Sequence, residues 1–122
     1  MPRYAAIDIG SNSLRMEAAE ILDGLPRILA SERQVTRLGA SVFKTGKVSL
    51  ESMDFVCGVL SQMATSYKKL GVSQVRAVAT AAIRDASNQQ EFLARASAAL
   101  GADVEIISGQ EEARLILSLI HI

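Results

Sequence analysis

The segment YAAIDIGSNS, residues 4–13, decides how this chain folds. Its apolar first half predicts a buried strand over residues 4–9. The strand pattern ends at Gly10, and residues 11–13 have the composition of a turn. The chain therefore opens with a buried strand whose carboxyl end carries small polar residues.

Strand and helix patterns alternate through the rest of the chain. We expect further strands over residues 14–22, 27–36, 74–80 and 103–107, and helices over 49–70, 88–100 and from 110 onward. Asp23 and Gly24 form a hairpin turn signal between the second and third strands. The order βββαβαβα predicts one α/β domain with a mixed five-stranded sheet, because strands separated by helices become parallel through right-handed crossovers.

The long helix has the clearest pattern. Ser49 is its predicted N-cap, and apolar residues recur at the spacing of one buried helix face. Cys57 lies on this face, so we expect a core thiol and not a nucleophile. Residues 39–48, before the helix, are predicted to form a loop in which Lys44 and Lys47 are either solvated or in contact with an extended polyanion. Glu17 interrupts the second strand and should point away from the core.

Composition excludes several classes of protein. The chain has 122 residues, 49% hydrophobic and 21% charged, with 13 basic and 13 acidic side chains. This is a globular composition of one domain's length, without the basic surplus of a nucleic-acid or membrane-surface binder. One cysteine and one histidine exclude an internal disulfide and a His-rich metal centre. No signal peptide or membrane-length apolar run occurs, so we expect a cytoplasmic protein without nucleic-acid or membrane partners.

The three parallel strands should bring polar residues to one edge of the sheet, because ligands bind beyond the carboxyl ends of such strands. Backbone and hydroxyl donors, a guanidinium and carboxylates are what is needed to bind and attack a phosphate. The residues that follow the three strands are Asp8, Gly10, Ser11, Asn12 and Ser13; then Thr80, Arg84 and Asp85; then Ser108, Gly109, Glu111 and Glu112.

Each of these pieces also has a purely structural interpretation. Residues 10–13 form either an anion-binding nest or a plain turn in which Gly10 supplies a positive φ. Arg84 alone is typical of a solvated surface arginine. Ser108 and Glu111 have the spacing of a capping box, which accounts for Glu111 but not for Glu112. A structural role for Glu112 stays open, because a carboxylate in the first helical turn gains slightly from the helix dipole. Ser87 or Asn88 is expected to cap the second helix.

Taken together, the motifs resemble those of the exopolyphosphatase / guanosine pentaphosphate phosphohydrolase (Ppx/GppA) family. The similar segments are residues 5–13, 35–39, 79–86 and 106–116. The resemblance implies the actin-like ATPase superfamily, of ribonuclease-H-like topology, and a two-domain enzyme with its active site between the domains. It also implies hydrolysis of phosphoanhydride bonds in inorganic polyphosphate or in guanosine pentaphosphate, a nucleotide of the stringent response.

The resemblance also implies a role for each motif residue. Asp8 would help to hold Mg²⁺ or another divalent cation through water. Residues 10–13 and Thr80 would bind phosphate, and Arg84 would bind the phosphoryl group that is lost. Glu112 would position or deprotonate the attacking water. Such a reaction needs charge neutralisation and an oriented water more than covalent chemistry.

The resemblance covers only a first domain, residues 1–116, and the family's second domain is absent. Residues 117–122 are expected to be a non-native tail resembling translated library-adapter sequence, so His121 receives no role. We therefore expect little activity from the chain alone, and a homodimer at full length. Two alternatives stay open: the first lobe of an actin-like ATPase or sugar kinase, and a non-enzymatic nucleotide-binding scaffold.

Overall fold

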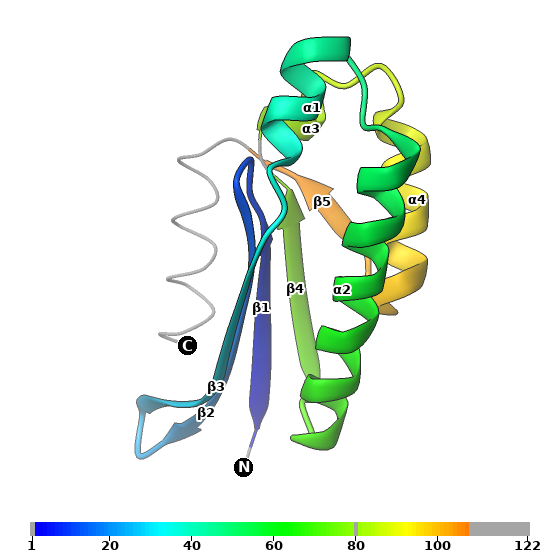
Figure 1. Ribbon diagram of the computed structural model, residues 1–122. Helices are drawn as coiled ribbons and strands as arrows, with labels where there is room; N and C mark the ends of the chain where they lie inside the picture. The colour runs from blue at the N-terminus through cyan, green and yellow to red at the C-terminus, as the bar shows by residue number, and fades with distance from the viewer. Residues whose placement is uncertain (1, 80, 108–122) are drawn as a thin grey trace.

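The computed structural model describes residues 2–79 and 81–107, which form a five-stranded sheet with helices on one face (Figure 1). The strand order is β3-β2-β1-β4-β5. The strands are β1 (Arg3–Ile9), β2 (Ser13–Leu22), β3 (Leu25–Val35), β4 (Gln74–Ala79) and β5 (Val104–Ile106). β1, β4 and β5 are parallel, whereas β2 and β3 run antiparallel to their neighbours. The predicted mixed sheet is therefore confirmed.

The hairpin between β2 and β3 closes at the predicted turn. Asp23 and Gly24 have φ values of 53° and 77°. Two successive residues with positive φ form the tight turn whose twist matches that of the flanking strands. The two strands then pair along their whole lengths, with one register shift between Ala18 and Ala19.

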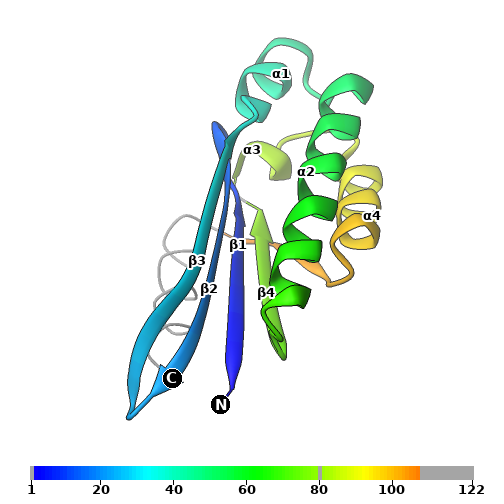
Figure 2. The ribbon, with the colours of Figure 1, turned by 60° about the horizontal axis from the view of Figure 1, so that its bottom comes forward.

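Helices α2 (Leu50–Lys69) and α4 (Gln89–Leu100) cover one face of the sheet (Figures 1 and 2). The Ser49 hydroxyl accepts a hydrogen bond from the Ser52 backbone N–H over 3.1 Å, as predicted for the N-cap. Burial of α2 follows the predicted apolar face: its buried residues are Met53, Val56, Leu60, Met63, Ala64 and Tyr67. Cys57 is half-buried instead of fully in the core, and burial raises the pKa of its thiol.

Two short helices were missed by the sequence analysis. The predicted loop over residues 39–48 is wrong for most of its length, because α1 (Leu38–Thr45) occupies it. Leu38 and Val42, one helical turn apart, are both buried and fix the helix against the core. The second missed helix, α3 (Ala81–Arg84), follows β4 directly.

The N-terminus of α4 also differs from the prediction. Asn88 occupies the N-cap position, but its side chain makes no capping hydrogen bond. Its amide instead pairs with the backbone of Val48, accepting from the N–H and donating to the carbonyl, each over 2.9 Å. Asn88 therefore ties α4 to the segment before α2.

One face of the sheet is apolar and the other face carries polar residues. Ala5, Ile7 and Ile9 of β1 are buried and belong to the core under the helices. Asp8 alternates with them and faces the opposite side, as does Glu17, whose β1 partner is Ala6. Glu17 thus points away from the core, as predicted. Within the described residues, no helix is both long and apolar enough to span a bilayer.

Candidate functional site

The carboxyl ends of β1 and β4 lie side by side. Ile9 pairs with Ala79, and Ala79 pairs in turn with Ile106 of β5. The backbone N–H of Ile107 continues this pairing by donating to the Ala79 carbonyl over 3.0 Å. The predicted convergence of strand ends is therefore confirmed as far as residue 107. Thr80, Ser108, Gly109, Glu111 and Glu112 lie outside the described residues.

Residues 10–13 form a turn that the chain between β3 and α1 holds in place. The Asn12 carbonyl accepts from the backbone N–H groups of Thr36 and Arg37 over 2.9 and 3.0 Å. The Ser11 carbonyl accepts from the Gly39 N–H over 2.7 Å. Within residues 2–79 and 81–107, the N–H groups of Ser11 and Asn12 have no hydrogen-bond acceptor. The carbonyls are thus engaged while two donors remain available, which is the pattern of an anion nest.

Two glycines in this region are required by close contacts. Gly10 does not have the positive φ expected of a plain turn, so that expectation is wrong. A Cβ at Gly10 would instead lie 3.0 Å from the Ser13 carbonyl oxygen. A Cβ at Gly39 would lie 3.0 Å from the Ser11 Cβ and 3.3 Å from the Ser11 carbonyl oxygen. At either position, a side chain would require its neighbour in the turn to shift by a few tenths of an ångström.

Asp8 lies on β1 just before this turn. Its Oδ1 atom is buried and has no hydrogen-bond partner among the described residues. Arg15 on β2 is the pairing partner of Asp8, but these two side chains form no ion pair. A buried carboxylate oxygen without a partner is costly, so this atom is suited to a ligand that brings positive charge.

A hard divalent cation such as Mg²⁺ fits the chemistry of Asp8, because it prefers oxygen ligands and keeps several waters. In the described part of the chain, no three His, Cys, Asp or Glu side chains gather into a metal site.

Arg84 and Asp85 follow β4, at the end of α3 and just after it, and Asp85 reaches a pocket that Ser11 of the turn also lines. Arg84 ends α3 with an exposed side chain, and its backbone carbonyl accepts from the Gln89 side chain over 3.1 Å. Asp85 lines an open pocket of about 390 Å³ with Ser11, Gly39, Val42 and Phe43. Residues that follow β1 and β4 thus contribute to one pocket. Sequence reasoning missed Phe43, although an aromatic residue beside Lys44 in a polar segment was a detectable signal.

Comparison with known proteins agrees with this geometry. The model of the Ppx/GppA phosphatase family matches residues 18–121. The chain belongs to this family. It is 37% identical over 115 residues to guanosine-5'-triphosphate,3'-diphosphate pyrophosphatase from Vibrio cholerae, and to the protein of the same name from Vibrio parahaemolyticus. The match covers 94% of this chain and 23% of either relative, so the chain spans about a quarter of their length.

Solved structures of Ppx/GppA proteins share the fold. The Aquifex aeolicus family member superposes with a TM-score of 0.87 at 38% identity, covering 93% of this chain and 37% of its own. An exopolyphosphatase from Cytophaga hutchinsonii gives a TM-score of 0.85 at 30% identity, covering 93% and 36%. RuvC from T. thermophilus, at 13% identity and a TM-score of 0.56, shares the fold alone. The predicted family and fold class are therefore confirmed.

Proposed function

We propose that this Ppx/GppA domain provides the first phosphate-binding half of an enzyme that hydrolyses phosphoanhydride bonds. Its substrate would be inorganic polyphosphate, guanosine pentaphosphate or both. The observation that carries the proposal is that Asp8 Oδ1 and the N–H groups of Ser11 and Asn12 lie close in the chain and lack partners among residues 2–79 and 81–107. Such a set of groups suits a phosphate and its counterion better than it suits a purely structural turn.

The names of the relatives support both substrates. The Vibrio cholerae relative is named for a guanosine polyphosphate, and the Cytophaga hutchinsonii relative is an exopolyphosphatase. The family match, with an exposed Arg84 at the end of α3, favours a hydrolase over the first lobe of a kinase or a non-enzymatic scaffold. We expect the full-length enzyme to be a cytoplasmic homodimer.

The reaction assigns one task to each group. The turn of residues 10–13, with Thr80 and Arg84, would hold the terminal phosphoryl group. Asp8 would hold Mg²⁺, which when bound neutralises phosphate charge. Glu112 would orient a water and take its proton as the water oxygen bonds to phosphorus. The bond from phosphorus to the bridging oxygen then breaks, which releases phosphate and a substrate shorter by one phosphate.

The test uses a chimera in which this chain replaces the matched segment of the Vibrio cholerae relative. We expect the chimera to release phosphate from guanosine pentaphosphate or polyphosphate with Mg²⁺, and the 122-residue chain alone to release almost none. Arg84→Ala should weaken both binding and turnover, because a guanidinium contacts phosphate in the ground and transition states alike. A folded chimera that hydrolyses neither substrate would refute the proposal.

Glu111 and Glu112 provide a matched pair within the same chimera. Glu112→Gln should abolish turnover and leave substrate binding nearly intact, because glutamine holds a water but takes no proton. Glu111→Gln should retain activity, since glutamine still completes a capping box. If Glu111→Gln is inactive and Glu112→Gln is active, the proposed roles of this pair are wrong.

A further inference from the structure

Two segments far apart in the sequence are fastened together by hydrogen bonds. The Ser87 backbone N–H donates to the Gly46 carbonyl over 2.8 Å. The Asn88 side-chain amide accepts from the Val48 N–H and donates to the Val48 carbonyl, each over 2.9 Å. We call these three hydrogen bonds the clasp. The clasp joins the segment that follows α1 to the segment that follows α3.

Helix α1 connects the clasp with the phosphate-binding turn. At the start of the helix, the Gly39 N–H donates to the Ser11 carbonyl over 2.7 Å. The helix ends at Gly46, whose N–H donates to the Val42 carbonyl and whose own carbonyl belongs to the clasp. The helix also packs against α3, which carries Arg84 (Figures 1 and 2). One short helix therefore contacts both elements that would hold the phosphoryl group.

The segment that carries Arg84 needs support from outside itself. Helix α3 has only four residues, and a helix this short is marginal without tertiary contacts. Ile83 is buried and anchors one side of α3. The Arg84 carbonyl accepts from the Gln89 side chain over 3.1 Å, and Gln89 is the neighbour of Asn88 in the chain. The position of the Arg84 backbone therefore depends on the clasp.

We propose that Asn88 is a positioning residue, which through the clasp sets the distance between the phosphate-binding turn and Arg84. The inference rests on the proposed function, in which the turn and the guanidinium hold the same phosphoryl group. A side-chain amide suits this task because it donates and accepts at once, and so fixes both polar groups of one backbone residue. A displacement of about 1 Å in a reacting group costs up to about 100-fold in rate. Loss of the clasp should therefore reach the reaction through Arg84.

The first experiment measures binding of tripolyphosphate to the 122-residue chain, with Mg²⁺, by calorimetry or NMR. Asn88→Ser removes the amide but keeps a good N-cap residue and adds no charge. We expect Asn88→Ser to weaken binding about threefold to tenfold, and Arg84→Ala to weaken it about tenfold. In the double variant, Asn88→Ser should add less than about twofold to the loss from Arg84→Ala, because its effect acts through that guanidinium.

Ser97→Ala is the matched control at the other end of α4. The Ser97 hydroxyl accepts from the Val104 N–H over 3.1 Å, so this substitution also removes a hydrogen bond between two elements. Both Asn88→Ser and Ser97→Ala should lower the midpoint of urea unfolding, but Ser97→Ala should leave the affinity for tripolyphosphate within about twofold of the parent. Asn88→Ala repeats the test if circular dichroism shows that Asn88→Ser does not fold.

Three results would overturn the inference. The first is that the parent chain shows no tripolyphosphate binding at millimolar concentration. The second is that Asn88→Ser binds tripolyphosphate as tightly as the parent, or no more weakly than Ser97→Ala. The third is that the losses from Asn88→Ser and Arg84→Ala multiply in the double variant, which would mean that Asn88 acts independently of Arg84.

Hydrolysis by the chimera separates this inference from the proposed function. In the chimera, Asn88→Ser should lower kcat/KM about tenfold, but less than about twofold in the Arg84→Ala background. If binding shows this coupling but the chimera hydrolyses neither guanosine pentaphosphate nor polyphosphate, the positioning role stands and the proposed function fails. If the chimera hydrolyses either substrate and the two losses multiply, the positioning role fails and the hydrolase stands.

Discussion

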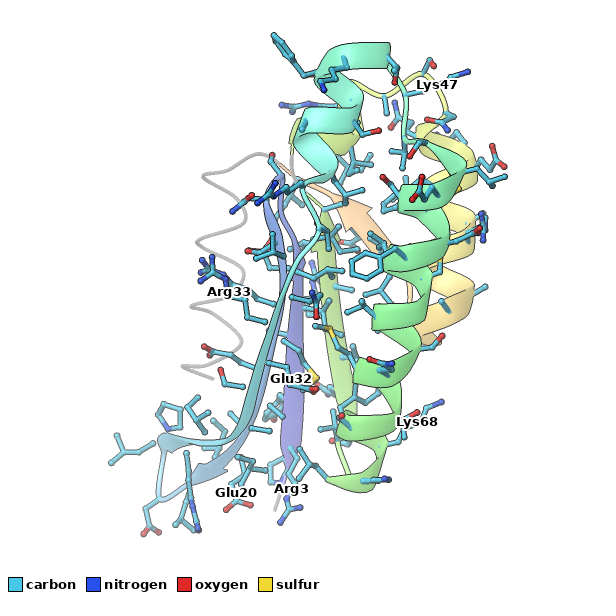
Figure 3. The ribbon with its side chains drawn as sticks, in the orientation of Figure 1. Arg3, Glu20, Glu32, Arg33, Lys47 and Lys68 are labelled. Atoms are coloured by element: carbon cyan, nitrogen blue, oxygen red, sulfur yellow. The ribbon has the colours of Figure 1, made fainter. Side chains whose placement is uncertain are left out.

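Two carboxylates near opposite ends of the sheet differ in whether they have a partner. Glu20 of β2 is only 7% exposed, and it pairs with Arg3 over 3.2 Å and with Arg27 over 3.4 Å. Figure 3 shows Arg3 and Glu20 together at this end, far from Lys47 at the other. Asp8 lies toward that other end, and its buried Oδ1 has no partner among the described residues.

The two ends also differ in how their backbone groups are hydrogen-bonded. At the Glu20 end, Arg3 also donates to the Leu70 carbonyl over 2.5 Å, and Tyr67 donates to the Leu100 carbonyl over 2.6 Å. At the Asp8 end, two N–H groups of the turn lack acceptors within the described residues. Buried polar groups are normally paired. In the described residues, the unpaired buried side-chain atoms are Asp8 Oδ1, Thr36 Oγ1 next to the turn and Glu32 Oε2 further along β3. The Glu20 end is paired within the chain, whereas the Asp8 end is where we propose that a ligand binds.

Asp8→Asn gives the largest expected effect. In the chimera we expect turnover to fall by about 100-fold or more, the usual loss when a charged group at a reacting phosphate is removed. In the 122-residue chain, the free energy of unfolding should stay the same or rise, because the substitution replaces a carboxylate whose buried Oδ1 has no partner among the described residues. Urea unfolding and phosphate release measure the two quantities. A destabilisation above about 1 kcal/mol would mean that Asp8 is a structural residue.

Gly39→Ala tests whether the close contact between α1 and the turn matters. The new Cβ would lie 3.0 Å from the Ser11 Cβ, so we expect a loss of about 1–3 kcal/mol in stability and a lower affinity for tripolyphosphate. Gly58→Ala is the control. It lies within α2 with nothing within 4 Å of its Cβ, and alanine there should stabilise by about 0.5–1 kcal/mol. Effects of the same sign at both positions would contradict the proposed contact.

Glu20→Gln is the counterpart of Asp8→Asn at the paired end. We expect the free energy of unfolding to fall by about 1–2 kcal/mol, a moderate loss because Arg3 and Arg27 remain partly exposed to water. Turnover of the chimera should remain within about twofold of the parent, since the pair lies away from the site. A large loss of activity with unchanged stability would reverse the comparison between the two ends.

The sequence predicted most of the sheet and the convergence of the strand ends at one edge. The apolar pattern of the strands, the Asp23–Gly24 turn and the apolar face of α2 are local patterns. Each can be recognised from the residues of its own element. Strand order then followed from general rules of chain connection. These rules placed the turn after β1 and the segment after β4 at the same edge without any knowledge of side-chain contacts.

The contacts that shape the site could not be predicted in this way. Helix α1 depends on the pairing of Gly39 with Ser11, 28 residues earlier in the chain. Asn88 binds the backbone of Val48 instead of capping its own helix. Gly10 is needed for the space it leaves and not for its φ. Each of these depends on a contact between segments, which a periodic pattern does not record.

Tyr67→Phe should have the smallest effect on stability. Its pH dependence tests the hydrogen bond of Tyr67 at the Glu20 end of the sheet. The hydroxyl donates to the Leu100 carbonyl, so its loss should cost about 1 kcal/mol at pH 7. Burial raises the pKa of Tyr67 above its ordinary value of 10.0, which means that the unfolded chain loses this proton more readily than the folded one. The contribution of Tyr67 is therefore fully present below pH 10.0 and declines as the pH rises through the higher pKa of the folded state.

Urea unfolding of the parent and of Tyr67→Phe between pH 7 and pH 11 measures this contribution. The stability difference between the two proteins should be constant up to about pH 10 and should shrink above it. Tyr4 and the lysines are present in both proteins, so their titrations cancel in the difference. A gap that stays constant to pH 11 would show that the hydroxyl is not held in the buried pair with Leu100, and the contrast between the two ends of the sheet would lose one of its supports.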